Sequence, residues 1–343
     1  MKIIKKTSDI RDLENIWINI DSENNSLTEF QTFSWNKILY SHFQKKKSIK
    51  KVSEIVFLVF ETEKSKIIIV PLMLDMIEKE ASIFGQSSIS DYLDFIYSQI
   101  EIDDLYNVVE YLLGMYPDFL FLFDRINESS LLFEMLTLKY QEISSERKIC
   151  AKIEVKSNMN YIHSLSKNSR QNYRTAVNRI NKSNLTYEVS IDIGKVNYQR
   201  LTKLYSLYVM RRLEKVKSSI RIKLKSFIKL VVMEVLHRSN DVLSDYLHSQ
   251  ENSLVAYINI NGDLAAYFAG IYKGRVLYIS RASISNKYKH FSPGVVCLIE
   301  TVEKIRNDFD IIDLTRGDEK YKIQCGAKQH YNYLFKLKGN RRI

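Results

Sequence analysis

The stretch RVLYISRASISNKYKHFSPGVVCLIETVEKIR, residues 275–306, decides the fold of this chain. Residues 275–282 form an apolar, β-rich run, which predicts a strand. A helical run begins at Ser292-Pro293-Gly294. Pro293 fits a first helical turn because it lacks the N–H that would have no partner there, and Ser292 fits the cap. These residues indicate either a plain helix start or an anion site, because amides and the positive end of the helix dipole attract phosphate.

Two hairpins are expected before this helix, from the runs 254–260, 264–272 and 275–282. Asn261-Gly262 joins the first two runs, and this dipeptide favours a tight turn that needs positive φ at both central residues. Further elements are expected after the helix: a strand at 311–314, a polar turn at 315–320 and a last strand at 331–338.

The rest of the chain gives a similar order of elements. Apolar spacing predicts helices at 8–20, 33–44, 102–115, 129–139, 161–182, 198–212 and 223–237. Strands are expected at 56–60, 66–74, 83–85 and 119–124. This order predicts an α+β fold of two similar halves, each a mixed, largely antiparallel sheet flanked by helices. We place the domains at 1–150 and 151–343.

Composition limits the class of protein. A chain of 343 residues with 45% hydrophobic and 27% charged residues can bury two ordinary cores. The apolar runs are too short to span a bilayer, and the N-terminus MKIIKKTSDI lacks the apolar core of a signal peptide. We therefore expect a cytoplasmic protein without a membrane span. The three scattered cysteines and six histidines show no ligand spacing, so we expect no structural metal.

The net charge of +11 raises the question of an anionic partner. The most interesting basic set lies in the expected helix 161–182. Arg170 and Arg174 are four residues apart there and would share a helix face. This face either meets phosphates or acidic groups or is simply solvated, and the residues alone leave both interpretations open.

Several motifs, taken together and in order, resemble a known family. They are Phe30-x-Thr32-x-x-Trp35, Pro71-Leu72, Phe84-Gly85 followed by Asp91-Tyr92-x-Asp94, the basic set Lys167, Arg170 and Arg174, Ala265-Ala266-Tyr267, the Ser-Pro-Gly at 292–294, and Asp313-Leu314-x-x-Gly317-Asp318-Glu319-x-Tyr321-Lys322. The set is similar to the CelD/BcsL-type acetyltransferases, a GNAT-superfamily branch with a BioF2-like acetyltransferase domain. One departure is that the phosphate loop keeps only Gly294 of the usual glycine pattern.

The resemblance implies two tandem GNAT-like (acyl-CoA N-acyltransferase) domains, the N-terminal one degenerate. It implies transfer of an acetyl group from acetyl-CoA to an amine or hydroxyl of a small molecule or a cell-surface polysaccharide precursor. The thioester would lie between splayed strands at 275–282 and 311–314. The acyl-CoA would be bound by Ser292, Pro293, Gly294 and Arg281, and the acceptor by Asp91, Tyr92, Asp94, Arg170 and Arg174.

The resemblance also implies catalytic residues in the segment 318–322. Asp318 or Glu319 would act as the base, Tyr321 would protonate the thiolate, and Lys322 would pair with a phosphate or a carboxylate. Each residue also has a structural interpretation. Asp318 and Glu319 suit a helix N-terminus, Tyr321 suits core packing, and Asp91 suits a turn cap.

Two other functions stay open at the level of sequence. The chain also resembles Fem-type aminoacyl-tRNA-dependent peptidyltransferases, in its two GNAT-like halves, its basic charge, and the spacing of Lys322 and Gly326. Such an enzyme would use charged tRNA as its donor, but the long helical arm common in that group is not found. A catalytically degenerate GNAT fold that binds nucleic acid or polysaccharide is the third possibility.

Overall fold

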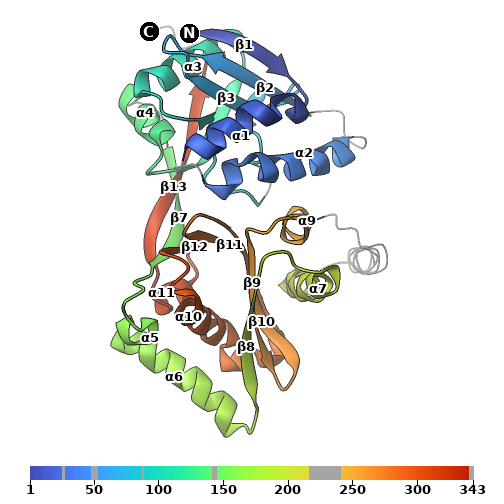
Figure 1. Cartoon of the computed structure of the whole chain (residues 1–343), viewed down its shortest axis with the longest axis vertical. Coiled ribbons are helices and arrows are strands. Elements are labelled where there is room, and N and C mark those ends of the chain that lie inside the picture. Colours follow the sequence, from blue (N-terminus) through green and yellow to red (C-terminus); the bar gives the residue numbers. More distant parts are fainter. Residues whose placement is uncertain (25–27, 48–52, 87–88, 141–144, 216–240, 340–343) are drawn as a thin grey trace. The chain divides into compact units, whose positions relative to one another are not determined.

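The computed structural model describes residues 1–24, 28–47, 53–86, 89–140, 145–215 and 241–339 (Figure 1). Their contacts divide the chain into two compact units. Unit 1 contains the described residues of Met1–Ile149 and His330–Ile343, and unit 2 is built from Cys150–Gln329. The expected helix at 223–237 lies outside the described residues. The division of the chain into domains 1–150 and 151–343 stays a prediction.

Unit 1 is a mixed sheet flanked by helices. Its strands are β1 (Lys2–Thr7), β2 (Ser53–Glu61), β3 (Ile67–Asp75), β4 (Glu80–Ile83), β5 (Ile96–Tyr97), β6 (Leu120–Asn127) and parts of β7 (Ser145–Glu154) and β13 (Lys328–Lys338). Its helices are η1 (Ile10–Leu13), α1 (Glu14–Glu23), η2 (Glu29–Gln31), α2 (Phe33–Lys47), α3 (Ile102–Met115) and α4 (Leu131–Lys139). The strand order is β1-β2-β3-β4-β6-β13, in which only the pair β4/β6 is parallel among the described pairs.

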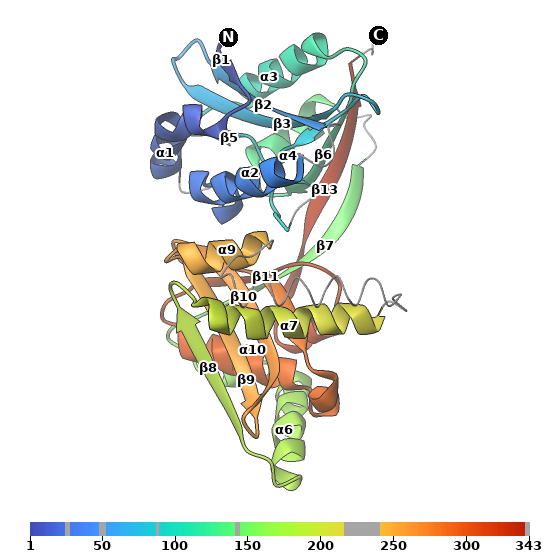
Figure 2. The same cartoon turned by 90° about the vertical axis from the view of Figure 1, so that its right-hand side faces the viewer.

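The sheet of unit 1 is covered on both faces, and Figure 2 shows α3 on one side and α1 and α2 on the other. The α3 side is a packed core because the helix buries one stripe of residues, at the spacing of a single face. That stripe is Leu105, Val108, Val109 and Leu112. On the other face the ring of Trp17 packs edge-on against Phe57, with 6.1 Å between centroids.

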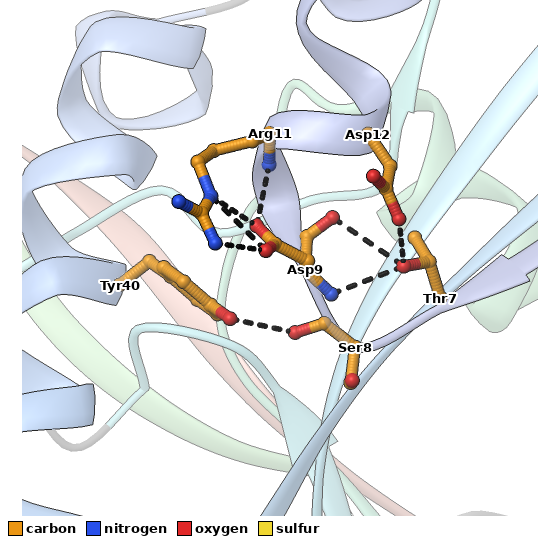
Figure 3. A network of polar contacts seen from close by, with 6 residues as sticks. All are labelled: Thr7, Ser8, Asp9, Arg11, Asp12 and Tyr40. Carbon is orange, nitrogen blue, oxygen red and sulfur yellow. Dashed lines mark hydrogen bonds and ion pairs between the residues drawn. The ribbon is translucent and has the colours of Figure 1, made fainter.

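A local polar network fixes the start of the chain against α2 (Figure 3). The Tyr40 hydroxyl donates to the carbonyl oxygen of Ser8 over 2.9 Å. Asp9 accepts hydrogen bonds from the backbone and the guanidinium of Arg11, and the guanidinium lowers the pKa of Asp9. The exposed charges pair with their own neighbours, so this network has a structural role in holding η1.

Unit 2 repeats the plan of unit 1. Its remaining strands are β8 (Tyr187–Ile193), β9 (Ser253–Ile260), β10 (Asp263–Lys273), β11 (Val276–Ile284) and β12 (Ile311–Arg316). Its helices are α5 (Tyr161–Ser164), α6 (Lys167–Lys182), α7 (Tyr198–Lys215), α9 (Val242–Ser249), η3 (Asn286–Phe291), α10 (Pro293–Ile305) and α11 (Lys320–Gln324). The order β7-β12-β11-β10-β9-β8 is antiparallel except for β11/β12.

Two faces of this sheet carry different helices, with α7 in front of it and α10 behind it in Figure 2. The apolar side chains of α10 and α6 form one core with those of β9 to β12. The expectation of one helix at 161–182 is wrong, because the chain is extended at Leu165 and Ser166. The Ser166 side chain accepts a hydrogen bond from the amide of Ser169 and so begins a new helix, α6.

Candidate functional site

The parallel strands β11 and β12 part after a short pairing. Their register runs from Val276↔Ile311 to Tyr278↔Asp313 and ends there. On its other edge β11 pairs with β10 and shifts register, because Ile279 opposes Gly270 and Arg281 opposes Ala269. Ser280 is therefore an extra residue, which defines a β-bulge where the two strands part. Bulges of this kind bend a strand and end its pairing, and they are frequent beside active sites.

Local contacts in β12 explain its divergence. The carboxylate of Asp313 accepts a hydrogen bond from the amide of Thr315 over 2.7 Å. Thr315 has a φ of +52°, a left-handed conformation that a β-branched residue rarely adopts. Its hydroxyl donates to the carbonyl oxygen of Ile279 over 3.0 Å. On its other edge β12 pairs with β7 both before this kink, at Asp313↔Lys152, and after it, at Arg316↔Cys150. The two strands are thus splayed beyond Tyr278 and Asp313.

The helix α10 begins close to this splay. Ser292 is its N-cap residue in a left-handed conformation, with φ of +54°, and its carbonyl oxygen accepts hydrogen bonds from the amides of Val295 and Val296. The Ser292 side chain makes no capping hydrogen bond, so the expectation that its hydroxyl caps the helix is wrong. Pro293 occupies the first turn, as the sequence indicated, and this turn contains no acidic residue.

Gly294 brings the backbone of α10 against the end of β11. A Cβ atom at this position would lie 3.3 Å from Cγ2 of Ile284. Across the described chain, no protein group accepts a hydrogen bond from the Gly294 amide. The amide and the positive end of the helix dipole are therefore available to an anion. The roles of Ser292, Pro293 and Gly294 in binding a cofactor stay predictions.

Basic side chains approach this helix start from α6. The guanidinium of Arg179 lies 3.4 Å from the carbonyl oxygen of His290, in the turn just before α10. The sequence of α6 contains five basic residues and no acidic one. Lys289 and His290 are exposed in the same turn. The potential around the helix start is thus positive, which favours a negatively charged ligand.

Arg281 lies on the opposite face of β11. Its guanidinium makes two hydrogen bonds with the carboxylate of Asp241, at 2.8 and 2.6 Å, and stacks 4.6 Å from the ring centroid of Tyr208 on α7. Burial opposes the charged forms, but Asp241 raises the pKa of Arg281 and Arg281 lowers the pKa of Asp241, so the pair is ionic. The bulge at Ser280 turns Arg281 away from α10, because it shifts the alternation of the strand by one residue. A role for Arg281 in cofactor binding stays a prediction.

Lys322 holds together the loop that follows β12. Its ammonium group donates to the carbonyl oxygens of Thr315 (3.3 Å), Arg316 (2.7 Å) and Gly317 (3.3 Å), and lies 3.1 Å from the Glu319 carboxylate. The residue is only 3% exposed. These contacts give Lys322 a positioning role; its predicted pairing with phosphate or substrate stays a prediction.

The other predicted catalytic residues lie around this loop. Asp318 and Glu319 are exposed to solvent, just before α11. Tyr321 packs on the core of unit 2, 6.4 Å from the ring of Phe268, and burial followed by the charge of Glu319 raises the pKa of its hydroxyl. A raised pKa makes this hydroxyl a weaker acid, so it does not by itself favour proton donation. The structure brings these side chains into one segment, while their catalytic roles stay predictions.

Two motifs that are far apart in the sequence, around Phe30 and around Tyr92, contact each other in unit 1. Trp35 Nε1 donates to the Ser90 hydroxyl over 2.8 Å, and the ring of Phe30 lies 6.3 Å from that of Tyr92. The predicted acceptor residues Asp91, Tyr92 and Asp94 are 3%, 1% and 5% exposed. Asp94 accepts hydrogen bonds from the amide of Phe95 and the hydroxyl of Tyr97, yet burial raises its pKa to about 7. Binding of an acceptor by these residues stays a prediction.

The two arginines of α6 that were predicted to bind substrate, Arg170 and Arg174, have different surroundings. The Arg170 guanidinium donates to the carbonyl oxygens of His163 and Leu165, so it satisfies the end of α5 and the turn that precedes α6. Arg174 is exposed on the same helix. Their common role in substrate binding stays a prediction.

Sequence reasoning missed Ser280, Thr315 and Asp241 as parts of this region. The signal for Ser280 is a break in alternation, because Leu277 and Ile279 face the α10 core before it and Ala282 and Ile284 do so after it. Thr315 and Asp241 have no comparable local signal, since their contacts come from distant parts of the chain.

Among the described residues, no group of three or more His, Cys, Asp or Glu side chains is arranged to hold a metal ion. No helix in the described ranges has both the length and the apolarity needed to cross a membrane.

The comparison with known proteins agrees with this geometry. Residues 167–323, from α6 to α11, match the family model described as "Acetyltransferase (GNAT) domain". No curated protein matches the chain. Among solved structures the chain is similar to a conserved protein of unknown function from Bacteroides thetaiotaomicron VPI-5482, at 12% identity over 98% of this chain and 100% of that chain, with a TM-score of 0.54.

Two further solved structures are similar over most of their length. One is L-PGS from Bacillus licheniformis, at 12% identity over 100% of this chain and 96% of that chain, with a TM-score of 0.51. The other is the C-terminal domain (DUF2156) of a putative lysylphosphatidylglycerol synthetase from Agrobacterium fabrum, at 11% identity over 96% and 92%, with a TM-score of 0.50. Likeness at these identities concerns the fold. The predicted class, an α+β fold of two GNAT-like units with flanked mixed sheets, is confirmed.

Proposed function

We propose that this protein is a CelD/BcsL-like acyltransferase that binds acyl-CoA, with acetyl-CoA as the donor, in unit 2. The acceptor is an amine or hydroxyl of a small molecule or a cell-surface polysaccharide precursor. One observation carries the proposal: β11 and β12 splay beyond Tyr278 and Asp313, beside a helix start that has an available amide and no acid in its first turn.

Two parts of the donor, its pyrophosphate and its thioester, would bind at different places in unit 2. Its pyrophosphate would accept a hydrogen bond from the Gly294 amide at the positive end of α10, and Arg179 on α6 would add charge. The thioester would enter the splay. There a backbone N–H of β11 beyond the last pair would stabilise the carbonyl oxygen as negative charge builds on it.

The reaction then requires two proton transfers. The acceptor nitrogen or oxygen attacks the thioester carbonyl carbon and loses its proton to Asp318 or Glu319, directly or through water. The carbon–sulfur bond breaks, and the coenzyme A thiolate leaves with a proton from Tyr321. Lys322 acts here by holding the carbonyl oxygens of the loop that presents these residues.

A second candidate is aminoacyl transfer from a charged tRNA. The net charge of +11 and the acid-free helix α6 favour it, because a polyanionic donor would be attracted to a basic surface. The two donors share an acyl group and differ in the anion that accompanies it, so a binding experiment can separate them.

The test is thermal unfolding with acetyl-CoA. A ligand at 100 times its Kd stabilises the folded protein by about 2.7 kcal/mol, so we expect a clear rise in Tm with acetyl-CoA. Gly294→Glu places a carboxylate at the phosphate site and should abolish this rise. Gly114→Glu is the matched control, because Gly114 is exposed on α3 and has nothing within 4 Å of an added Cβ.

Three outcomes decide between the proposals. A rise with acetyl-CoA that is lost in Gly294→Glu and kept in Gly114→Glu supports the acyl-CoA enzyme. No rise with acetyl-CoA, together with salt-sensitive tRNA binding and transfer of the aminoacyl group, supports the second candidate. Salt-sensitive binding of nucleic acid without any transfer contradicts both and leaves a binding module.

A further inference from the structure

A pocket of about 290 Å³ opens on one face of the unit 1 sheet, where β3, β4 and β6 are paired. Its volume is at the lower end of the range for small-molecule sites. One row across the three strands, Met73↔Ser82↔Leu122, contributes to its lining. The neighbours of these residues along the strands, such as Ala81 and Phe121, pack in one core with α3. The pocket therefore lies on the face of the sheet that α3 does not cover.

Three carboxylates line this pocket, although the net charge of the chain is +11. Asp75 and Glu80 are direct partners in the register of β3 and β4. Asp124 lies two residues beyond Leu122 on β6 and so projects from the same face. Like charges that oppose each other directly on neighbouring strands destabilise a sheet. A cation that binds between Asp75 and Glu80 would therefore be stabilised by both.

The lysines near these carboxylates are engaged elsewhere or with only one of them. Nζ of Lys79, in the turn just before Glu80, lies over the ring of Phe119, 5.3 Å from its centroid. Nζ of Lys148 lies 2.6 Å from the carboxylate of Asp124. Within the described part of the chain, the Glu80 carboxylate forms no ion pair. Its negative charge is thus left for a ligand.

A buried hydroxyl belongs to the same pocket. Ser82 is 9% exposed and lines the pocket, and its hydroxyl has no hydrogen-bond partner in the ranges that the structure describes. Oδ1 of Asp75 accepts from the amides of Ile77 and Glu78, both over 3.0 Å, and so holds the turn after β3. Most buried polar groups in proteins are paired. The unpartnered Ser82 hydroxyl therefore points to a polar ligand in the pocket.

We propose that this pocket binds a small organic amine through its ammonium group, as carried by an amino sugar or by a linear diamine. An ammonium group has three N–H donors and no acceptor, so it can bind the carboxylates of Asp75 and Glu80 at once. Hydrogen bonds between an ammonium group and carboxylates are among the strong ones. The body of the amine lies on Met73 and Leu122, and a hydroxyl on it pairs with Ser82.

An organic cation fits this pocket better than a metal ion does. No group of three or more His, Cys, Asp or Glu side chains in the described ranges is arranged to hold a metal. Met73 and Leu122 offer an apolar surface that a hydrated ion does not use, whereas the carbon atoms of an amine can contact it. The pocket lies wholly in unit 1, and its existence does not depend on the donor that unit 2 binds.

Isothermal titration calorimetry of the full-length protein tests the pocket with three probes, at low salt because salt screens partly exposed charges. Glucosamine and 1,4-diaminobutane represent the two sources of an ammonium group, and N-acetylglucosamine has the sugar ring without the positive charge. We expect at least one amine to bind, and N-acetylglucosamine to bind more weakly by roughly tenfold or more, because it lacks the charged hydrogen bonds. The amine that binds more tightly identifies the source.

Two variants assign the binding to this pocket. Glu80→Gln nearly keeps the size of the side chain and removes its charge, so amine binding should weaken by roughly tenfold or more. Glu78→Gln is the matched control, because it makes the same change at an exposed position of the same turn, outside the pocket. Ser82→Ala removes no hydrogen bond within the described protein, so it should leave the Tm nearly unchanged and weaken the binding of glucosamine only.

Three results would overturn the proposal. The first is the absence of binding by both amines at millimolar concentration. The second is equal binding of glucosamine and N-acetylglucosamine, which would mean that the ammonium group is not recognised. The third is the same affinity for the amines in Glu80→Gln as in Glu78→Gln. The Tm rise with acetyl-CoA is expected to be the same in Glu80→Gln as in the unmodified protein, so failure of this site can be told apart from failure of the donor site.

Discussion

Among the described residues each unit contains one parallel pair of strands, with a helix between the two strands in the chain, and the two pairs end differently. In unit 1 the register of β4 and β6 ends at Ser82↔Leu122. Beyond it, the segment 90–94 lies between the two strands. The Leu93 amide donates to the carbonyl oxygen of Arg125 on the β6 side, and a Cβ on Gly85, just past β4, would lie 3.2 Å from the Ser90 hydroxyl.

In unit 2 no such segment intervenes among the described residues. The chain passes from β11 directly through η3 to Ser292, and the hydroxyl of Thr315 contacts the carbonyl oxygen of Ile279 where the strands part. The same architecture therefore gives a closed pair in unit 1 and an open pair in unit 2.

The helices that connect the two strands of each pair, α3 and α10, differ in the charge of their first turns. The first turn of α3 contains Asp103 and Asp104, and the amide of Glu101 donates to the Asp104 carboxylate over 3.1 Å. The first turn of α10 contains no acid. The dipole of α3 is thus neutralised by its own side chains, whereas that of α10 is left for another anion. Closed strands and an acidic helix start thus occur together in unit 1, whereas the helix start in unit 2 has no acid in its first turn.

The largest expected effect concerns the ion pair beside the open strand. Arg281→Met leaves the buried carboxylate of Asp241 without its partner, so the free energy of unfolding should fall by about 3–5 kcal/mol. Urea unfolding of the purified variant measures this loss. If the open pair of unit 2 needs this support, the acetyl-CoA shift should weaken as well.

Arg275→Met is the matched control at the start of the same hairpin strand. Its partner Asp310 is 2.9 Å away, but the two side chains are 49% and 60% exposed, so removing this pair should destabilise the protein much less than removing the buried pair. The double variant Arg281→Met/Asp241→Leu should recover part of the lost stability, because no charge is left buried. Equal losses for Arg281→Met and Arg275→Met would contradict a special role of the buried pair.

Local chemistry explains which parts of the fold could be predicted from sequence. The hairpin at Asn261-Gly262 and the helix start at Pro293 follow from turn geometry and spacing, and the structure has both. Strands β1, β7 and β8 were missed, because their residues are mostly half-buried or exposed and form no apolar run.

The details of the site could not be predicted in the same way. The side chain of Arg281 was expected to reach a cofactor, yet the bulge at Ser280 directs it to Asp241, forty residues away in sequence. Lys322 was expected to pair with a phosphate or a substrate carboxylate, which stays a prediction, and its contacts with the carbonyl oxygens of its own loop were not foreseen. Such contacts depend on tertiary packing, which a motif does not encode.

The second-largest expected effect on stability concerns Asp94, in the segment 90–94 that lies between β4 and β6 of unit 1. Burial raises the pKa of Asp94 to about 7, against about 3.8 in an unfolded chain. Between these values the folded protein holds a proton that the unfolded chain has lost, so the free energy of unfolding should fall as pH rises from about 4 to 7. A shift of this size corresponds to about 4 kcal/mol. Asp94→Asn should remove this part of the pH dependence, measured by urea unfolding across that range.

The control for this measurement is Asp118→Asn, because Asp118 is exposed in the same unit. It should leave the pH dependence as in the unmodified protein. A slope that is unchanged in Asp94→Asn would mean that the segment 90–94 is hydrated in solution. The closed pair of unit 1 would then be more like the open pair than the structure indicates.

The smallest effect concerns the two helix starts, where exchanging charge should have opposite consequences. Asp104→Asn removes the acid that accepts from the Glu101 amide, and thermal unfolding should show a loss of about 0.5–1 kcal/mol with the acetyl-CoA shift unchanged. Ser292→Asp adds an acid to α10, at a left-handed position that Asp tolerates. It should leave the stability of the free protein nearly unchanged or slightly higher and reduce the acetyl-CoA shift, because the new carboxylate repels the pyrophosphate. If Asp104→Asn and Ser292→Asp both change the stability and neither changes the acetyl-CoA shift, then the charge at the helix start does not explain a difference in donor binding between the two units.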